Sequence, residues 1–321
     1  MSRPLRIEYP GAWYLVLNHG RKTAKVFDKS TDYQEFIDLL REASALWNIG
    51  ITAYCLVPDH YHLLLKTPES NLSRCMRHIN GIYTQRYNKR HDIDGSLFKG
   101  RFKCILLPED HILLEMVRYI HREPVRKGLV SLVDEYQWSS HPGYLSFDKK
   151  WEWLGKEVIL SMLPGKHGES VRIYQEYMNI ETPNGVLSVF DKKKLPAIMG
   201  GKDFMAWARK NFFNEKFDRH VPASAILAPD VASIKKAVCL AYRVDESELM
   251  ISRRGRFNEA RGVAIYLTRI LRKDSLDLIA AAFDMSGYSS VSSAIVRLKK
   301  QLQKDRLLPG KIEEIKAEIL A

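Results

Sequence analysis

The hydrophobic and polar residues in the first part of the chain predict alternating strands and helices. Residues 12–19 (AWYLVLNH) and 101–108 (RFKCILLP) are rich in aliphatic and aromatic residues, as strands are. Residues 31–47, 72–91 and 109–121 carry apolar residues at helical spacing. After the first helix, the runs "IGITAYCLVP" and "HYHLLLKT" follow each other closely and predict an antiparallel hairpin. The predicted order is βαββαβ followed by one more helix.

This order is that of an α+β, ferredoxin-like domain, in which helices cover one face of an antiparallel sheet. The next part of the chain, from about residue 150 to 225, has only short amphipathic pieces and is expected to be a helical connector. We expect the first domain to end near residue 148.

The last part of the chain is strongly helical and predicts an all-α domain. Apolar residues recur at helical spacing in residues 232–244, 258–272, 275–284 and 289–305. The turn between the last two contains Gly287, as the tight turn of a helix-turn-helix often does. The predicted domains are 1–148, a connector at 149–225, a helix-turn-helix domain at 226–306 and a C-terminal tail at 307–321.

The charge balance favours a polyanionic partner. The chain has 50 Lys and Arg against 38 Asp and Glu, a net charge of +12 and a pI near 9.4. Such a surface suits nucleic acid first and an anionic membrane second. No apolar run approaches the roughly 20 residues of a membrane span, and no cleavage site follows the N-terminal apolar run. The 4 cysteines are isolated in the sequence, as is typical of reduced cysteines that pack in a core. Together these features lead us to expect a cytoplasmic protein without a membrane partner.

The predicted strand "HYHLLLKT" carries two imidazoles, His60 and His62, separated by one residue. Alternate residues of a strand point to the same side, which places their Cα atoms roughly 7 Å apart. Two imidazoles at that distance can converge on one divalent ion. The alternative is that one histidine is a satisfied core residue and the other faces solvent, which is the commoner outcome for an isolated pair of this kind.

The predicted helix 109–121 and the residues after it add a phenol and a carboxylate. Tyr119 and Glu123 lie four residues apart and therefore on one helical face. Glu123 could supply a third metal ligand while the phenol of Tyr119 reaches the substrate of the same ion. The alternative is a solvated carboxylate in a last helical turn, before Pro124, and a half-buried aromatic ring.

A basic segment follows the two histidines and is interleaved with the aromatic residues Tyr83, Tyr87, Phe98 and Phe102. Neutralisation of phosphates by cations and stacking of bases on aromatic rings are what binding of a single strand requires. The alternative is a solvated helix face. The candidate DNA contacts are Arg74, Arg77, Arg86, Lys89, Arg90, Lys99, Arg101 and Lys103.

Four stretches, in this order and spacing, together resemble the single-tyrosine HUH transposases, and among them the REP-associated tyrosine transposases. They are "VPDHYHLLL", "INGIYTQRYNKRH", "GSLFKGRFK" and "RYIHREPVRKGL", and the resemblance covers about residues 1–145. It implies that His60 and His62 bind a divalent ion and that Tyr119 is the nucleophile. It also implies a 5′-phosphotyrosine intermediate.

Three positions depart from that family's pattern. Tyr61 stands where a small aliphatic residue is usual, while Asp59 and Glu123 each stand in place of an asparagine. Glu123 can still ligate, and with more charge, so we expect an altered metal site. Magnesium prefers oxygen ligands whereas imidazole suits manganese better, and we expect either ion to serve.

The C-terminal segment resembles the duplex-binding domain of the bacterial replication initiator DnaA in "ARGVAIYLTR" and in "SSVSSAIVRLKK". The initiator's usual His-Thr pair is replaced here by serines, so no sequence preference can be transferred. The alternative is a helical bundle that dimerises or only packs. The resemblance implies base contacts by Ser289, Ser290, Ser292 and Ser293, and phosphate contacts by Arg253, Arg254, Arg256 and Lys299.

These features together predict a metal-dependent transposase that nicks and joins single-stranded DNA at hairpins or palindromic repeats. Its partner would be single-stranded hairpin DNA, with duplex DNA bound by the C-terminal domain, and its active unit a monomer or homodimer. One alternative is a DNA-binding regulator derived from such an enzyme that has lost cleavage, for which Glu123 leaves room. Another is an RNA-binding protein that uses the same basic helix.

Overall fold

The computed structural model describes residues 6–164, 169–192, 194–216, 222–251 and 257–320. The chain divides into two compact units, one covering Arg6–Gly201 and the other beginning at Lys202. Within the part of the chain that is described, no helix is long and apolar enough to cross a membrane.

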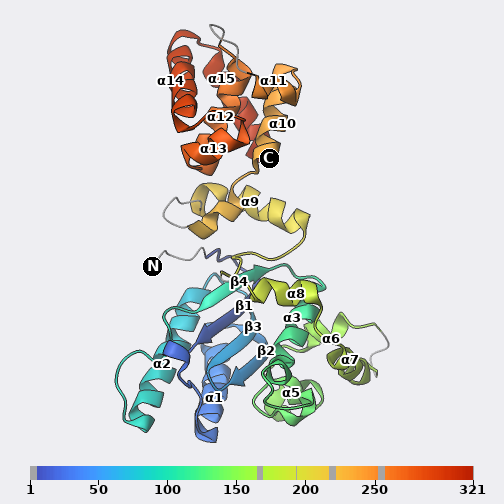
Figure 1. The fold of residues 1–321 in the computed structure, drawn as a ribbon. Coiled ribbons are helices and arrows are strands. Elements are labelled where there is room, and N and C mark those ends of the chain that lie inside the picture. Colours follow the sequence, from blue (N-terminus) through green and yellow to red (C-terminus); the bar gives the residue numbers. More distant parts are fainter. Residues whose placement is uncertain (1–5, 165–168, 193, 217–221, 252–256, 321) are drawn as a thin grey trace. The chain divides into compact units, whose positions relative to one another are not determined.

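The first unit is built on a four-stranded antiparallel sheet in the order β2-β3-β1-β4 (Figure 1). Two residues join β2 to β3, so the predicted hairpin is confirmed. The ferredoxin-like order βαββαβ with a following helix is confirmed as well. In chain order the elements are β1 (Ala12–His19), the short 3-10 turn η1 (Arg21–Thr23), α1 (Ser30–Trp47), β2 (Gly50–Val57), β3 (His60–Thr67), α2 (Leu72–His91), β4 (Lys103–Leu107) and α3 (Ile112–His121).

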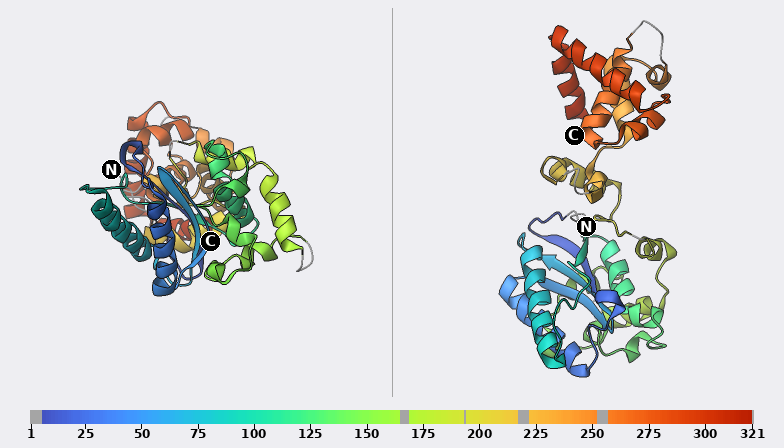
Figure 2. Two further views of the ribbon diagram at one scale, coloured as in Figure 1. Left: turned by 90° about the horizontal axis from the view of Figure 1, so that it is seen from below. Right: turned by 60° about the vertical axis from the view of Figure 1, so that its left-hand side comes forward.

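Helices cover both faces of this sheet (Figure 1, Figure 2). On one face the ring of Tyr61 lies 5.0 Å from that of Phe36 in α1, and its hydroxyl donates to Asn80 of α2 at 2.8 Å. On the other face the ring of His62 stacks on that of Tyr119 in α3. The two helices of the βαββαβ unit therefore cover one face, as predicted, and the additional helix α3 covers the other. Because α3 buries the second face, β3 is almost continuously buried, as a strand between two layers must be.

The segment after α3 folds onto the same unit and protects both edges of the sheet. Leu154 forms a bridge with Ile51 at the β2 edge, and Ile198 forms one with Leu106 at the β4 edge. Backbone groups at sheet edges need such partners. The predicted boundaries at 148 and 225 therefore differ from the division at Gly201. The elements are α4 (Glu123–Arg126), η2 (Val133–Glu135), α5 (His141–Tyr144), η3 (Lys149–Trp151), α6 (Glu157–Ser161), α7 (Ser170–Asn179) and α8 (Asn184–Phe190).

The second unit is all helical in its described residues, as predicted. The side chains of Asp230, Asn258 and Ser275 cap three of its helices by accepting backbone N–H groups. The predicted tail at 307–321 contains a helix whose Leu308, Ile312 and Ile315 are buried, at the spacing of one helical face. The elements are α9 (Lys202–Lys216), η4 (Pro222–Leu227), α10 (Val231–Tyr242), α11 (Glu246–Met250), α12 (Glu259–Arg272), α13 (Leu276–Ala282), α14 (Tyr288–Lys304) and α15 (Leu308–Leu320).

Candidate metal and tyrosine site, and the basic surfaces

The two histidines of β3 lie side by side beneath α3. The ring centroids of His60 and His62 are 4.9 Å apart, and the two side chains are 2% or less exposed. His19 of β1 is the register partner of His60, and their ring centroids are 4.7 Å apart. The strand alternation that predicted a shared face therefore holds, and that face is buried.

His60 is held by carboxylates at both ring nitrogens. Its Nδ1 lies 2.8 Å from Asp59 Oδ1 and its Nε2 lies 3.1 Å from Glu123 Oε1. Burial alone would lower the pKa of His60, but the two carboxylates outweigh it and raise that pKa. Asp59 thus orients the ring so that Nε2 points to Glu123, the arrangement by which a carboxylate positions a metal-ligating histidine.

His62 is in the opposite electrostatic state. Burial, with the neighbouring positive charges, lowers the pKa of His62 to about 3, so the ring is neutral at physiological pH. Its Nδ1 is buried and has no hydrogen-bond partner among the described residues. A neutral imidazole with a free nitrogen is the form that ligates a metal.

Glu123 begins α4, directly after the C-terminal end of α3. The side chain is buried, with Oε1 facing His60 and Oε2 accepting from Arg126. Burial would raise the pKa of the Glu123 carboxyl, but His60, His62 and Arg126 outweigh it and lower that pKa. Glu123 is therefore an ionised, buried carboxylate, and the alternative of a solvated one is wrong.

The ligand atoms of His60, His62 and Glu123 all lie within 4.8 Å of one another. Two imidazole nitrogens and a carboxylate oxygen form a donor set that suits a first-row divalent ion such as manganese. A second group with the same spacing, His19, Asp59 and His60, shares one histidine with the first. The residues that the sequence nominated as ligands are thus brought together, with a buried unpartnered nitrogen among them.

Tyr119 lies against this group and is covered by an aromatic ring. Its ring stacks on that of His62 at 5.4 Å and on that of Phe190 at 3.9 Å. Only 6% of Tyr119 is exposed. Burial raises the pKa of the Tyr119 phenol far above its usual range, Glu123 raises it further, and Arg126 opposes both.

The site includes residues that sequence reasoning missed. A cleft of about 410 Å³ is lined by the histidines, Tyr119 and Glu123 together with Arg126, Lys127, Phe190 and Lys192. Phe190 ends α8, in the segment expected to be a connector. The sequence contained one sign that this segment could belong to the site, the basic run that follows Phe190. That run did not indicate that the segment would fold back onto Tyr119.

The basic segment from α2 to the start of β4 exposes most of its predicted DNA contacts to solvent but buries its aromatic residues. Tyr83, Tyr87, Phe98 and Phe102 are 5% or less exposed, so the prediction that they stack on bases was wrong. They lie on the core side, where Tyr83 donates to the backbone of Val26. The exposed cations on α2, the following loop and the start of β4 are Arg74, Arg77, Arg86, Lys89, Lys99, Arg101 and Lys103.

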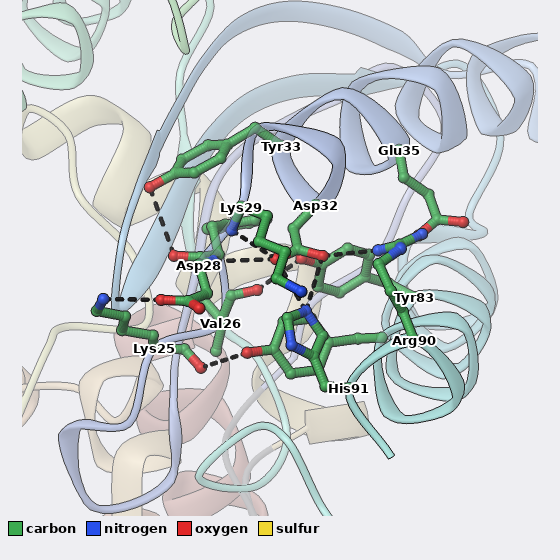
Figure 3. Close-up of polar contacts among 12 residues, drawn as sticks. Lys25, Val26, Asp28, Lys29, Asp32, Tyr33, Glu35, Tyr83, Arg90 and His91 are labelled. Atoms are coloured by element: carbon green, nitrogen blue, oxygen red, sulfur yellow. Dashed lines mark hydrogen bonds and ion pairs between the residues drawn. The ribbon is translucent and has the colours of Figure 1, made fainter. Parts of the chain in front are cut away.

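Arg90, also a predicted DNA contact, is engaged in ion pairs inside the unit (Figure 3). Its guanidinium donates to Asp32 Oδ1 at 2.7 Å and also to Glu35. His91 and two backbone N–H groups before α1 also contact Asp32, which is fully buried. This cluster connects the end of α2 to the start of α1. The guanidinium of Arg90 is therefore already paired with carboxylates within the unit in the absence of DNA.

The second unit places three predicted serine contacts at a cleft. Ser289, Ser290 and Ser293 of α14 line a cleft of about 300 Å³ together with Arg261 and Arg297. The predicted contact Lys299 is exposed on the same helix. The helix-turn-helix is formed by α13 and α14. The predicted phosphate contacts Arg253, Arg254 and Arg256 lie outside the described residues.

Two family models match separate parts of the chain. Residues 12–123 match the family described as "Transposase IS200 like", and residues 231–297 match "Bacterial dnaA protein helix-turn-helix". The chain thus combines an IS200-like transposase domain with a DnaA-type helix-turn-helix domain. Transposases are enzymes. Both resemblances predicted from the sequence are confirmed.

Two curated relatives agree with this division. A Haemophilus influenzae protein, provisionally named a REP-associated tyrosine transposase, is 26% identical over 122 residues, which cover 34% of this chain and 69% of that protein. The replication initiator DnaA of Nautilia profundicola is 37% identical over 87 residues, covering 27% of this chain. The chain spans only 20% of the length of that initiator.

Two solved structures also resemble the chain. One is a REP-associated tyrosine transposase bound to a REP hairpin, with 21% identity and a TM-score of 0.38, covering 44% of this chain and 82% of that one. The other is a provisionally assigned transposase from Deinococcus radiodurans, with 19% identity and a TM-score of 0.27, covering 38% and 98%. At such values the assignment rests on the sequence matches.

Proposed function

We propose that the first unit is a metal-dependent strand transferase that cleaves single-stranded DNA through Tyr119. The observation that carries this proposal is the convergence of His60, His62 and Glu123 within 4.8 Å, with Tyr119 stacked on His62. These three side chains would hold a divalent ion, magnesium or manganese. When bound, such an ion neutralises charge that develops on the nonbridging oxygens of a phosphodiester.

In the proposed reaction the Tyr119 phenol oxygen attacks the phosphorus of a phosphodiester. A phosphorus–oxygen bond forms to Tyr119, the bond to the 3′ oxygen breaks, and the proton lost by the phenol is balanced by one gained at the 3′ hydroxyl. The product is a tyrosyl phosphodiester at the DNA 5′ end, which a second 3′ hydroxyl can reverse. The substrate must displace Phe190, because its ring covers Tyr119.

The exposed cations of α2, the loop to β4 and the first residue of β4 would bind the phosphates of the single strand. Lys103 belongs both to this set and to the lining of the Tyr119 cleft, which supports a continuous path for the strand. A short hairpin, from a palindromic repeat, is the substrate we propose. The helix-turn-helix of the second unit would bind duplex DNA, with Ser290 and Ser293 at base edges and Lys299 at phosphate.

The test is covalent capture of a hairpin-containing oligonucleotide with manganese, resolved on a denaturing gel. We expect an adduct from the native protein and none from Tyr119→Phe. The matched control is Tyr177→Phe in α7, since that tyrosine donates a hydrogen bond to Glu115 and does not line the cleft. An adduct that persists in Tyr119→Phe would rule out this nucleophile.

One observation favours a second function, a DNA-binding regulator without cleavage. Tyr119 is almost fully covered, and Glu123 is already paired with Arg126. This alternative predicts binding of the hairpin, no adduct with manganese or magnesium, and unchanged binding after His60→Ala and His62→Ala together. The same oligonucleotide assay, with a binding measurement beside it, decides between the two.

A further inference from the structure

We propose that Arg126 is a catalytic residue that binds a nonbridging oxygen of the scissile phosphate. This inference rests on the proposed strand-transfer function and extends it. Arg126 ends the short helix α4, one turn after Glu123. Its guanidinium carbon lies 4.1 Å from the centroid of the Tyr119 ring. The cation therefore lies over the ring of the proposed nucleophile.

The guanidinium is fixed in place by two acceptors. Nη2 donates to the backbone oxygen of Tyr119 at 2.7 Å and also to the Glu123 carboxylate. A positively charged group held in advance costs no reorganisation when negative charge develops, which is the basis of electrostatic stabilisation in enzymes. By contrast, the Lys127 side chain on the same cleft is about half exposed, and its Nζ lies 4.0 Å from Glu123 Oε1.

The other arm of the guanidinium has no acceptor. Arg126 Nη1 is buried and has no hydrogen-bond partner among the described residues. Leaving a buried donor unpaired is costly, so such groups call for an explanation. Arg126 lines the Tyr119 cleft, and the flat guanidinium matches phosphate oxygens. Once Phe190 is displaced, a phosphate placed for attack by Tyr119 would supply the missing acceptor.

The chemistry requires no proton from Arg126. A phosphodiester carries one negative charge, and more charge collects on its nonbridging oxygens as the bond from Tyr119 forms and the bond to the 3′ oxygen breaks. Arginine stays protonated throughout, so it neutralises that charge from the start to the end of the step. Its presence does not alter which bond forms or which bond breaks.

A purely structural role, in which Arg126 only holds Glu123 and the end of α3, must be distinguished from this one. The discriminating experiment couples a variant with a change in the substrate. The rate of adduct formation is measured in a single turnover, with saturating hairpin oligonucleotide and manganese, for the native protein and Arg126→Ala. Both are tested on a normal scissile phosphate and on an uncharged methylphosphonate at that position.

We expect Arg126→Ala to slow adduct formation on the normal phosphate by about a hundredfold or more. On the methylphosphonate the native protein should be slow and the variant little slower, since the charge that Arg126 binds is already gone. Such non-additivity is the signature of a direct contact. An equal loss on both substrates would overturn the inference.

Arg122→Ala is the matched control, because Arg122 donates to the backbone of Met178 and does not line the cleft. We expect it to react with both substrates as the native protein does. If Arg126→Ala does not fold, Arg126→Lys carries the test, with a smaller loss and the same non-additivity. If the native protein forms no adduct, the strand-transfer proposal itself fails. A native adduct with additive losses refutes only the role of Arg126.

Discussion

The two faces of strand β3 have the same burial but different chemistry. Tyr61 points to the ring of Phe36 in α1 and to the amide of Asn80 in α2. His60 and His62, its neighbours on each side, point to ionisable groups beneath α3 and α4. One strand therefore supports a packed core on one face and a charged site on the other. Strand geometry sets the spacing of the two imidazoles, since alternate residues of a strand point to the same side.

The comparison shows that burial alone does not distinguish a core residue from a site residue. On the core face Tyr61 has its hydroxyl satisfied by Asn80. On the site face Nδ1 of His62 and Nη1 of Arg126 have no partner among the described residues. These two buried atoms are among several unsatisfied ones in the described residues, and they are the ones that a metal ion and a phosphate at the site could satisfy.

The largest expected effect comes from the site face. His62→Ala removes one of two imidazole ligands, and we expect adduct formation to fall by about a thousandfold, because a bound ion contributes several kcal/mol to phosphoryl transfer. The measurement is the single-turnover rate at increasing manganese. Tyr61→Phe, one residue away on the core face, is the control and should react at the native rate. Equal losses in both variants would contradict the division of the two faces.

The core face should instead control stability. Phe36 of α1 is fully buried and contacts three aromatic rings, including that of Tyr61. Phe36→Ala leaves a cavity, and we expect the free energy of unfolding to fall by about 3–5 kcal/mol. Chemical denaturation measures this loss. At a temperature where the variant is still folded, its rate of adduct formation should be near that of the native protein. A much lower rate in the folded variant would contradict the prediction.

The Asp32 cluster of Figure 3 gives the core side a pH dependence. Burial would raise the pKa of the Asp32 carboxyl, but hydrogen bonds from Lys29, His91 and Arg90 outweigh it and lower that pKa. A lowered folded pKa stabilises the fold above the unfolded value of about 3.9, and this stabilisation is lost as pH falls through the folded pKa. We expect Asp32→Asn to cost about 2 kcal/mol at neutral pH. Denaturation at pH 7 and pH 3 should show this difference shrinking on acidification; a constant difference would disprove it.

The smallest expected effect is at the rim of the site. Phe190→Ala removes the ring that covers Tyr119, and we expect adduct formation to become about tenfold faster if uncovering costs about 1.4 kcal/mol. The rate at saturating oligonucleotide measures this. Leu187→Ala is the control. Leu187 lies in the same helix and lines the same cleft, but it has no aromatic ring that could stack on Tyr119. A slower Phe190→Ala variant would show that the ring positions Tyr119 rather than covers it.

The sequence predicted the strands and helices of the first unit well because their signals are local. The strand at residues 12–19 and the helices at 31–47 and 72–91 coincide with β1, α1 and α2 to within a residue. Strand alternation also placed His60 and His62 on one side. The face of α2 that would be buried could not be read locally, so its aromatic residues were assigned to DNA instead of the core.

Residues from distant segments could not be assigned to the site. Phe190 meets Tyr119 only because α8 returns to α3 after a long excursion, and no local pattern encodes such a contact. Arg126 is close to Tyr119 in sequence. That its Nη1 is buried without a partner among the described residues can be seen only in the folded structure. The extent of the first unit to Gly201 could not be read locally for the same reason, because bridges from Leu154 and Ile198 join the later segment to the sheet.

The sequence by itself determined the element order, the paired imidazoles and the two family resemblances, since these depend on local periodicity and on motifs in a fixed order. The tertiary structure alone decided which face of β3 is core and which is site, because that depends on the helices packed on each side. It also decided the charge states of His60, His62 and Glu123, since a pKa is set by burial and by neighbours that only the folded chain brings together.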